Sequence, residues 1–477
     1  MGTVEPLRAT GAPAIPADQV RRIELTSQRR QLLQGDWVAM LRSWVVAQIS
    51  PIRAQLVGQP DTAENLFKGL TTQIAQRYSL PPTIRSTEPE AAEGMRLLMS
   101  PYFSGMAQLL EEFTLGLRNA FVYVGWDPDM GRPVFRVVAP DSTLVEASEY
   151  DPSRPIRIAE AVRRPSGGEM VWTWNVWSIV GDDPYFKILN NDRSQDLTAI
   201  YSPDLVGWRG AGYPYRDESG APILPYQLYS AKPSGNSVFQ PGENSEQVVG
   251  TLQIGLLNTT LMHAALRASW SQRVILGGLV RGTSTDAGIS YQVADPTTIL
   301  QIESSGDSPP SIGEWGSPLS MEEVERTTRR YAARLAVHYG LSPADLVVES
   351  LNPASGASIT VSRAGIRNLQ LRSTAQFSAS DLSLLARTVY IARSWDPAYQ
   401  ALPAYGYTIA YNGGLALTPT ERVQVDAYCA SEFGAGVLDR VGWYQETHPG
   451  SSPQDARIAL QAIDRARSED SPPVDEE

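Results

Sequence analysis

The sequence predicts an α+β fold, and three observations lead to this prediction. Apolar residues recur with helical spacing up to about residue 117, and from residue 121 they alternate with a period of two, which is typical of strands. Further along, residues 243–339 have the order helix, short β runs, helix. The chain has 477 residues, enough for two or three domains or for one elongated subunit made of several parts.

The amino-terminal part predicts helices. Residues 1–24 contain many Pro and Ala residues, so we expect a flexible arm. A helix is expected over Ser27–Gln48, with Leu32, Leu33, Trp37, Leu41 and Trp44 on its inner side. Three more helices are expected after Asp61, over Pro89–Leu98 and over Phe103–Leu117.

A β region follows these helices. The segments Phe121–Gly125 and Val134–Val138 flank a turn at 127–131 and predict a hairpin. Four more strands are expected at Thr143–Glu146, Ile156–Val162, Val171–Ile179 and Tyr185–Leu189. Trp172 and Trp174 share a face with Val176, where they either fill the core, which we favour, or stack on a ligand. Residues 205–241 are rich in turn formers.

The central stretch predicts two helices joined by a small β module. The first helix opens at Asn244 with Gln247 three residues later, a capping-box pattern, and the second opens with Ser320 and Glu323 and ends at Gly340. Short β runs between them are expected at Val274–Val280, Ile289–Val293 and Ile299–Ile302. The order fits a stalk with a small head at its tip, or an ordinary helical hairpin in a larger domain.

The carboxyl-terminal third is again mostly helical. Residues 341–356 contain too many Pro and Gly residues for a helix, and a long helix is expected over Ala357–Ser394. A short hairpin is expected within Tyr399–Leu417, a helix near Pro419, and a last helix from Ser452-Pro453. The tail from Ser468 is acidic and is expected to be disordered.

Composition limits the environment and the partners. The net charge of −12 argues against a general nucleic-acid binder. The single cysteine, Cys429, excludes an intrachain disulfide and fits a reducing compartment. The chain shows neither a signal peptide nor an apolar run long enough to cross a membrane, so we expect a soluble protein without a membrane partner.

The sequence lacks common motifs of nucleotide-binding and catalytic sites. The sequence contains no phosphate-binding loop of the form G-x-x-x-x-G-K-[ST], no H-E-x-x-H and no G-x-S-x-G. Its three histidines, His263, His338 and His448, are far apart in sequence. We therefore assign no catalytic, cofactor-binding or metal-binding residues and do not expect an enzyme. A hydrolase with dispersed catalytic residues is the alternative.

The long helix concentrates positive charge. Residues 350–394 contain Asp381 as their only acidic residue, against Arg363, Arg367, Arg372, Arg387 and Arg393, a net charge of +4. These arginines predict contacts either with phosphates or with carboxylates of a neighbouring subunit. We favour pairing between subunits for most of them, with acids at 146, 149, 151, 322, 323 and 325 as candidate partners, and DNA contact for Arg363 and Arg367.

In the order of its parts, the chain resembles the portal proteins of tailed double-stranded DNA bacteriophages. The similarity is carried by Glu246–Gly277, by Tyr339-Gly340-Leu341-Ser342, by Ala354-Ser355-Gly356-Ala357 and by His448-Pro449-Gly450 ahead of a final helix. None of these is a catalytic signature. Together they cover parts of a region from about residue 60 to 465.

The resemblance implies an elongated α+β subunit with the architecture of wing, two-helix stem, β clip and helical crown. Its parts would be the arm 1–24, the wing 25–243, the first stem helix 244–272, the clip 273–320, the second stem helix 321–340, the channel-loop region 341–356, the long wing helix 357–398, the crown 399–467 and the acidic tail 468–477. Asn352, Pro353, Ser355 and Gly356 are the candidate residues of the channel loop.

The resemblance also implies a function and partners. Such a subunit forms a ring, usually of twelve copies, at one capsid vertex, through which DNA enters and leaves. Its partners would be further copies of itself, the major capsid protein, the large terminase subunit, head-tail adaptor or tail proteins, and the double-stranded DNA in the channel. It would be assembled in the host cytoplasm and reside in the virion. A different oligomeric virion protein, of the neck or baseplate, is the main alternative.

Overall fold

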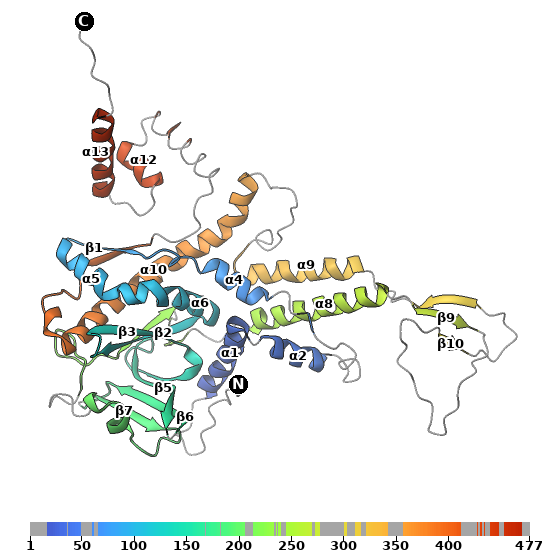
Figure 1. Ribbon diagram of the computed structural model, residues 1–477, viewed down its shortest axis with the longest axis horizontal. Helices are drawn as coiled ribbons and strands as arrows, with labels where there is room; N and C mark the ends of the chain where they lie inside the picture. Colours follow the sequence, from blue (N-terminus) through green and yellow to red (C-terminus); the bar gives the residue numbers. More distant parts are fainter. Residues whose placement is uncertain are drawn as a thin grey trace, which may run out of the picture. The chain divides into compact units, whose positions relative to one another are not determined.

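The structure is a computed structural model of the whole chain, and its elements are labelled in Figure 1. The described residues are 17–35, 37–48, 60–61, 65–166, 168–181, 183–205, 213–232, 235, 237–239, 245–269, 272–276, 300–302, 311–315, 321–341, 356–411, 427, 430–431, 434, 439–447 and 453–469. The chain divides into two compact units. Unit 1 comprises Met1–Leu33, Phe67–Asn244 and Glu349–Glu477, and unit 2 comprises Gln34–Leu66 and Ser245–Val348.

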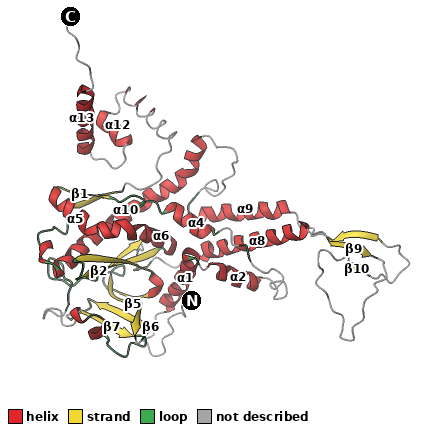
Figure 2. Ribbon diagram, in the orientation of Figure 1, coloured by secondary structure: helices red, strands yellow, loops and turns green. Residues whose placement is uncertain are grey.

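Unit 1 mixes helices and sheets, as Figure 2 shows. Its described α-helices are α1 (Ala17–Gln34, whose last residue lies in unit 2), α4 (Leu66–Ile74, whose first residue does), α5 (Pro89–Pro101), α6 (Ala107–Leu117), α7 (Thr198–Tyr201), α10 (Gly356–Trp395), α12 (Arg440–Thr447) and α13 (Pro453–Glu469). A π-helical turn, Tyr102–Met106, joins α5 to α6. The two helices expected over 89–98 and 103–117 are therefore one continuous helical segment. Pro101, which has no N–H donor, is the last residue of α5 and lies directly before the π-helical turn.

The strands of unit 1 form three antiparallel sheets. The strands are β1 (Thr83–Ser86), β2 (Asn119–Asp127), β3 (Arg132–Val138), β4 (Thr143–Ala147), β5 (Pro155–Ser166), β6 (Glu169–Ser178), β7 (Tyr185–Asn190), β8 (Tyr226–Ser230) and β12 (Tyr407–Ala410). The sheet orders are β3-β2-β8, β4-β5-β6-β7 and β1-β12. The hairpin and the four strands expected from alternation are confirmed, whereas β8, in the turn-rich segment 205–241, was not expected.

The core of unit 1 lies between the β3-β2-β8 sheet and its helices. Six of the first seven β2 residues are buried, so both faces of this strand are covered. Helices α6 and α10 both contact β2 and β8. On α10, Leu384, Leu385 and Val389 are completely buried. The predicted long helix over 357–394 is thus confirmed, and its middle is a core element.

Unit 2 contains the helix–β–helix segment. Its helices are α2 (Trp37–Gln48), α8 (Ser245–Ser269) and α9 (Met321–His338), and its strands are β9 (Gln272–Leu276), β10 (Leu300–Ile302) and β11 (Ser311–Trp315). The three strands form one sheet in the order β10-β9-β11, with β10 parallel and β11 antiparallel to β9. The run at 289–293 lies outside the described residues, and β11 was not expected.

The second helix of this segment ends where the sequence indicates. Gly340 has φ +75°, a left-handed conformation that glycine adopts without steric cost. The Leu341 N–H donates to the Ala336 carbonyl at 2.9 Å, and the Gly340 N–H donates to the Val337 carbonyl at 2.9 Å. This is the Schellman pattern of helix termination, and buried Leu341 completes it.

Two expectations near the chain's ends are wrong. The helix expected over 27–48 is two helices, α1 and α2, since Gly35 has φ +117° between them. Because α1 begins at Ala17, the last residues of the expected flexible arm are helical. Of the hairpin expected within 399–417, the structure describes the part up to Tyr411, in which β12 pairs with β1, more than 300 residues earlier. Residues 412–426, where a helix is expected near Pro419, and the tail from 470 lie outside the described residues, while α13 starts as predicted.

Candidate functional site

The candidate channel-loop residues fall mostly outside the described part of the chain. This holds for Asn352, Pro353 and Ser355, and Gly356 is the first residue of α10. The backbone at Arg363 and Arg367 is helical, while their side chains lie outside the described part. Arg372 is exposed on the same helix. The proposed roles of these residues in contacting DNA therefore stay predictions.

Arg387 and Arg393 have partners within their own chain. The Arg387 guanidinium donates to the Leu224 carbonyl, and burial lowers the pKa of this arginine to about 10. The Arg393 guanidinium lies 3.3 Å from the Glu218 carboxylate and donates to the Leu402 carbonyl at 2.7 Å. These contacts tie α10 to the segments before β8 and before β12. Pairing of the two arginines with carboxylates of a second subunit stays a prediction.

The acids considered as partners also have neighbours in their own chain. The Glu146 carboxylate pairs with Arg157 at 2.6 Å, Glu325 pairs with Arg329 at 2.6 Å, and Glu323 lies 3.6 Å from Arg326. All three pairs are largely exposed, so each contributes little to stability.

In unit 2, α8 and α9 pack side by side through small residues. A Cβ atom on Gly250 would lie 2.9 Å from Leu335 Cδ1, so the glycine allows the two helices to approach closely. Glu246, near the start of α8, lies 3.0 Å from His338, at the end of α9. The two helices therefore run antiparallel, and the β9–β11 sheet lies between the end of α8 and the start of α9 along the chain. At a rise of about 1.5 Å per residue, α8 is roughly 38 Å long.

The contact of α8 with α2 is closer still. A Cβ atom on Gly255 would lie 2.7 Å from Leu41 Cδ1, and Leu41 is completely buried. Thr259, one turn later, donates to the Gly255 carbonyl at 2.7 Å and accepts from the Asp61 N–H at 3.0 Å. The sequence predicts both helices but not this contact, which brings together residues more than 200 positions apart.

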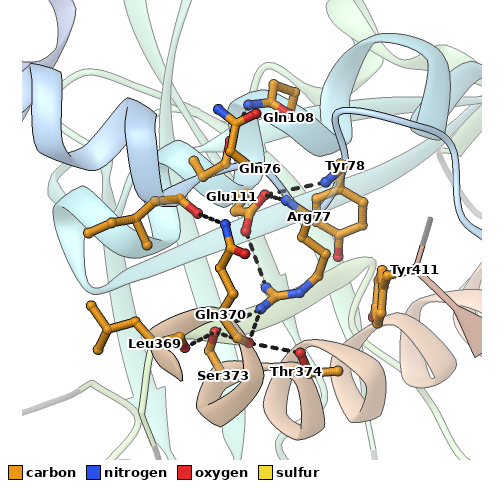
Figure 3. A network of polar contacts seen from close by, with 12 residues as sticks. Gln76, Arg77, Tyr78, Gln108, Glu111, Leu369, Gln370, Ser373, Thr374 and Tyr411 are labelled. Carbon is orange, nitrogen blue, oxygen red and sulfur yellow. Dashed lines mark hydrogen bonds and ion pairs between the residues drawn. The ribbon is translucent and has the colours of Figure 1, made fainter. Parts of the chain in front are cut away.

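Unit 1 contains a buried ion pair that the sequence did not indicate (Figure 3). Arg77 and Glu111 are almost completely buried and 3.4 Å apart, and the Glu111 carboxylate also accepts from the Arg77 N–H at 2.8 Å. The Arg77 guanidinium donates to the Ser373 hydroxyl at 2.7 Å and to the Gln370 carbonyl at 2.9 Å, both on α10. Burial raises the pKa of Glu111 to about 7, against the opposing effect of Arg77.

A second buried acid, Asp381 of α10, is surrounded by tyrosines. Tyr78 and Tyr411 each donate to its Oδ2 at 2.7 Å, and Tyr229 donates to its Oδ1 at 2.6 Å. Burial raises the pKa of Asp381 to about 6, and the three hydrogen bonds oppose the rise. The sequence signal was present, since Asp381 is the only acid within 350–394. It did not reveal the tyrosines, which come from three distant segments.

A third buried acid, Glu160 on β5, joins two sheets. Arg136 of β3 binds its carboxylate with two hydrogen bonds, the longer at 2.8 Å, and Tyr226 of β8 donates to it at 2.8 Å. Burial raises the pKa of Glu160, while the charge of Arg136 acts in the opposite direction. In all three networks every acid faces tyrosine or arginine donors from other elements, an arrangement that fixes the packing of those elements.

The described residues offer no group of three or more His, Cys, Asp or Glu side chains that could hold a metal ion. Within the same residues, no helix combines the length and apolarity needed to cross a membrane.

Comparisons with known proteins give a limited result. No family model and no curated protein matches the chain. Among solved structures, a chain from the virion of a native gene transfer agent particle is 13% identical, with a TM-score of 0.42, covering 86% of this chain and 99% of that one. A chain from the neck of an empty gene transfer agent particle is 12% identical, with a TM-score of 0.39, covering 83% of this chain and 96% of that one.

Proposed function

We propose that the chain is a portal subunit: a non-enzymatic structural protein of a phage-like virion that forms a ring at one capsid vertex. The observation that carries the proposal is the α8–sheet–α9 segment of unit 2, an antiparallel helix pair with a three-stranded sheet between its helices along the chain. In this assignment α8 and α9 are the stem and the β9-β10-β11 sheet is the clip. Unit 1 supplies most of the wing, including α10, and the crown, including α12 and α13.

The packing of the helix pair suits a stem. Gly250 and Gly255 leave space for Leu335 and Leu41, so α8 is held closely by α9 and by α2. A pair of helices held in this way can carry a small sheet that would be marginal alone, because three strands of five residues or fewer bury little apolar surface. Pairing between neighbouring subunits would complete the stability of such a sheet.

The proposed partners follow from this assignment. The ring would contain further copies of the chain, usually twelve, and would bind the major capsid protein, the large terminase subunit and then an adaptor or tail protein. Double-stranded DNA would pass through the channel near Asn352, Pro353, Ser355 and Gly356. The chain lacks a phosphate-binding loop of its own, so a separate ATPase would drive packaging.

The mass of the purified chain in solution tests this proposal. A portal subunit is expected as a closed ring of about a dozen copies by native mass measurement, with a holed disc in negative-stain images. A mass that corresponds to a monomer or a dimer would contradict the proposal that the chain forms a ring. Rings with residues 278–316 replaced by a Gly-Ser bridge should form but lose their adaptor, and retained adaptor binding would contradict the clip assignment.

A further inference from the structure

The four-stranded sheet of unit 1 presents one face that is rich in cations and aromatic rings. Across the β5–β6 pair, Arg163 is the direct partner of Trp172, and Trp174 is paired with Ala161 and with Leu189 of β7. Because side chains alternate along a strand, Trp172 and Trp174 lie on the same face of the sheet as Arg163. We call this side the β5–β7 face; it also contains Lys187, opposite Val176.

The β5–β7 face differs from the opposite face of the same sheet. On the opposite face, Ile158, Glu160, Asn175, Trp177 and Ile188 are all buried. On the β5–β7 face, Arg163 and Lys187 are exposed and Trp172 is 37% exposed. The expectation that both tryptophans fill the core is therefore wrong for Trp172, while Trp174 is 1% exposed.

An arginine lies over each indole ring. The Arg163 guanidinium carbon lies 5.1 Å from the Trp172 ring centroid, and that of Arg193 lies 4.3 Å from the Trp174 ring centroid. A cation over an indole ring is an attractive arrangement, and it holds the guanidinium in place. The aromatic rings thus position two of the three cations on this face.

Two of the three guanidinium nitrogens of Arg193 have no acceptor. Its Nε and Nη2 atoms are enclosed and have no hydrogen-bond partner among the described residues. Its backbone has φ 61°, a left-handed conformation that is uncommon for a residue with a side chain. The turn holds it there, because the Arg193 N–H donates to the Asn190 carbonyl at 3.0 Å and Asn190 Nδ2 donates to Ser194 at 3.1 Å. Donors left without acceptors cost free energy. Because these two atoms are enclosed, an anion can contact Arg193 only through the rest of its partly exposed side chain.

The carboxylates around this face are already engaged. Glu146 pairs with Arg157 at the β4 edge. Asp192 accepts from the Ser194 hydroxyl at 2.6 Å, and the Asp196 carboxylate accepts from the Thr198 N–H at 2.9 Å. Asp196 also interacts electrostatically with Lys187. Neither Arg163 nor Arg193 forms an ion pair in the described structure.

From this arrangement we infer that the β5–β7 face binds single-stranded nucleic acid, with phosphates on Arg163, Lys187 and Arg193 and a base against the exposed indole of Trp172. Single strands suit a sheet face because their unstacked bases reach aromatic rings, which the stacked bases of a duplex do not. Arginine forks match the geometry of phosphate oxygens. The inference is independent of the ring, since all these residues belong to one chain, in the β4-β5-β6-β7 sheet and in the turn after β7.

Fluorescence anisotropy with a short labelled oligothymidine tests the inference on the purified full-length chain. Binding should weaken by about fourfold for each doubling of salt, since three phosphate contacts are lost to counterions. Trp172→Ala should weaken binding about tenfold, the typical contribution of one stacked base. The double variant Arg163→Gln and Lys187→Gln should reduce both the affinity and the salt dependence.

Controls separate this face from the general charge of the chain. Arg132→Gln, an exposed arginine of β3, should bind as tightly as the unchanged chain. Two results would overturn the inference: no binding of the oligothymidine, or binding that Trp172→Ala leaves unchanged. The same measurement is made with double-stranded DNA and with polyglutamate. If either binds as tightly as the oligothymidine or more tightly, and the same substitutions weaken that binding, the inference is overturned and the face is assigned to a duplex or to an acidic protein segment. Circular dichroism of each variant verifies that it is folded.

Discussion

The two units hold their helices together by different means. In unit 1, α10 is fixed by buried polar groups. Arg77, paired with Glu111, donates to Gln370 and Ser373 on one stretch of the helix, and Asp381 accepts from its tyrosines on another. In unit 2, α8 is fixed by close apolar contact, where glycines leave space for Leu335 and Leu41. The stability of the polar contacts in unit 1 depends on matched hydrogen bonds and on pH, whereas the stability of the apolar contacts in unit 2 depends on side-chain volume. Four changes test this contrast.

The largest effect is expected from breaking the buried ion pair. Arg77→Met leaves the Glu111 carboxylate without its cation and removes two hydrogen bonds to α10, so the free energy of unfolding should fall by about 3–5 kcal/mol. Urea denaturation measures this change. The double change Arg77→Met with Glu111→Leu should recover much of the loss, because no unpaired charge stays buried. A single variant as stable as the unchanged chain would contradict the role of the pair.

The stability of unit 1 should depend on pH because of its buried acids. Burial raises the pKa of Glu111 to about 7 and that of Asp381 to about 6, whereas in the unfolded chain both lie near 4. Their stabilising contribution is therefore complete below about pH 4 and is lost as the pH rises through 6 and 7. Between pH 8 and pH 5 we expect these groups to raise the free energy of unfolding by on the order of 1–3 kcal/mol.

Comparison with Asp381→Asn isolates the part of Asp381 from the exposed carboxylates, which titrate equally in both proteins. The variant's stability should change less between pH 5 and pH 8 than that of the unchanged chain, as measured by denaturation at each pH. Parallel pH profiles of the two proteins would show that Asp381 does not titrate in this range.

In unit 2, added volume should be the damaging change. Gly255→Ala places a Cβ atom 2.7 Å from Leu41 Cδ1, so we expect a loss of about 1–2 kcal/mol despite the better helix propensity of alanine. Gly69→Ala in α4 is the matched control, since nothing lies within 4 Å of its Cβ position; it should stabilise by about 0.5–1 kcal/mol. Thermal unfolding compares the two. A Gly255→Ala variant more stable than the unchanged chain would rule out the close contact.

The smallest effect is expected at an exposed ion pair of unit 2. Glu325 and Arg329 of α9 are one helical turn apart, 2.6 Å between charged atoms, and both are about half exposed. Arg329→Ala should lower the free energy of unfolding by about 0.3–0.5 kcal/mol, and added salt should remove the difference. Arg330→Ala, at the next exposed position, is the control. A loss as large as that of Arg77→Met would remove the distinction between buried and exposed pairs.

Local signals explain which elements could be predicted. The alternation of apolar residues located β2 to β7, and the helix ends at Gly340 and Pro453 follow from the conformational limits of those residues. β8 was missed because its neighbours are turn formers and its stability comes from pairing with β2. For the same reason no local signal indicates that β12 pairs with β1.

The candidate sites show the same division. The charge of the α10 arginines is visible in the sequence, but Arg387 is buried against the Leu224 carbonyl, a contact over more than 160 positions. The tyrosines around Asp381 and the arginines over Trp172 and Trp174 were likewise not recognisable as clusters. Each member is an ordinary residue of its own segment.

The sequence by itself determined the periodicity, the helix ends and the order helix, β module, helix in residues 243–339. These depend on interactions within a few residues of one another. Only the tertiary structure decided which acids are buried, which glycines lie against leucines and which side chains of the β4-β5-β6-β7 sheet are exposed. These features depend on partners far apart in the chain, and burial determines whether a charge such as that of Glu111 keeps its usual pKa.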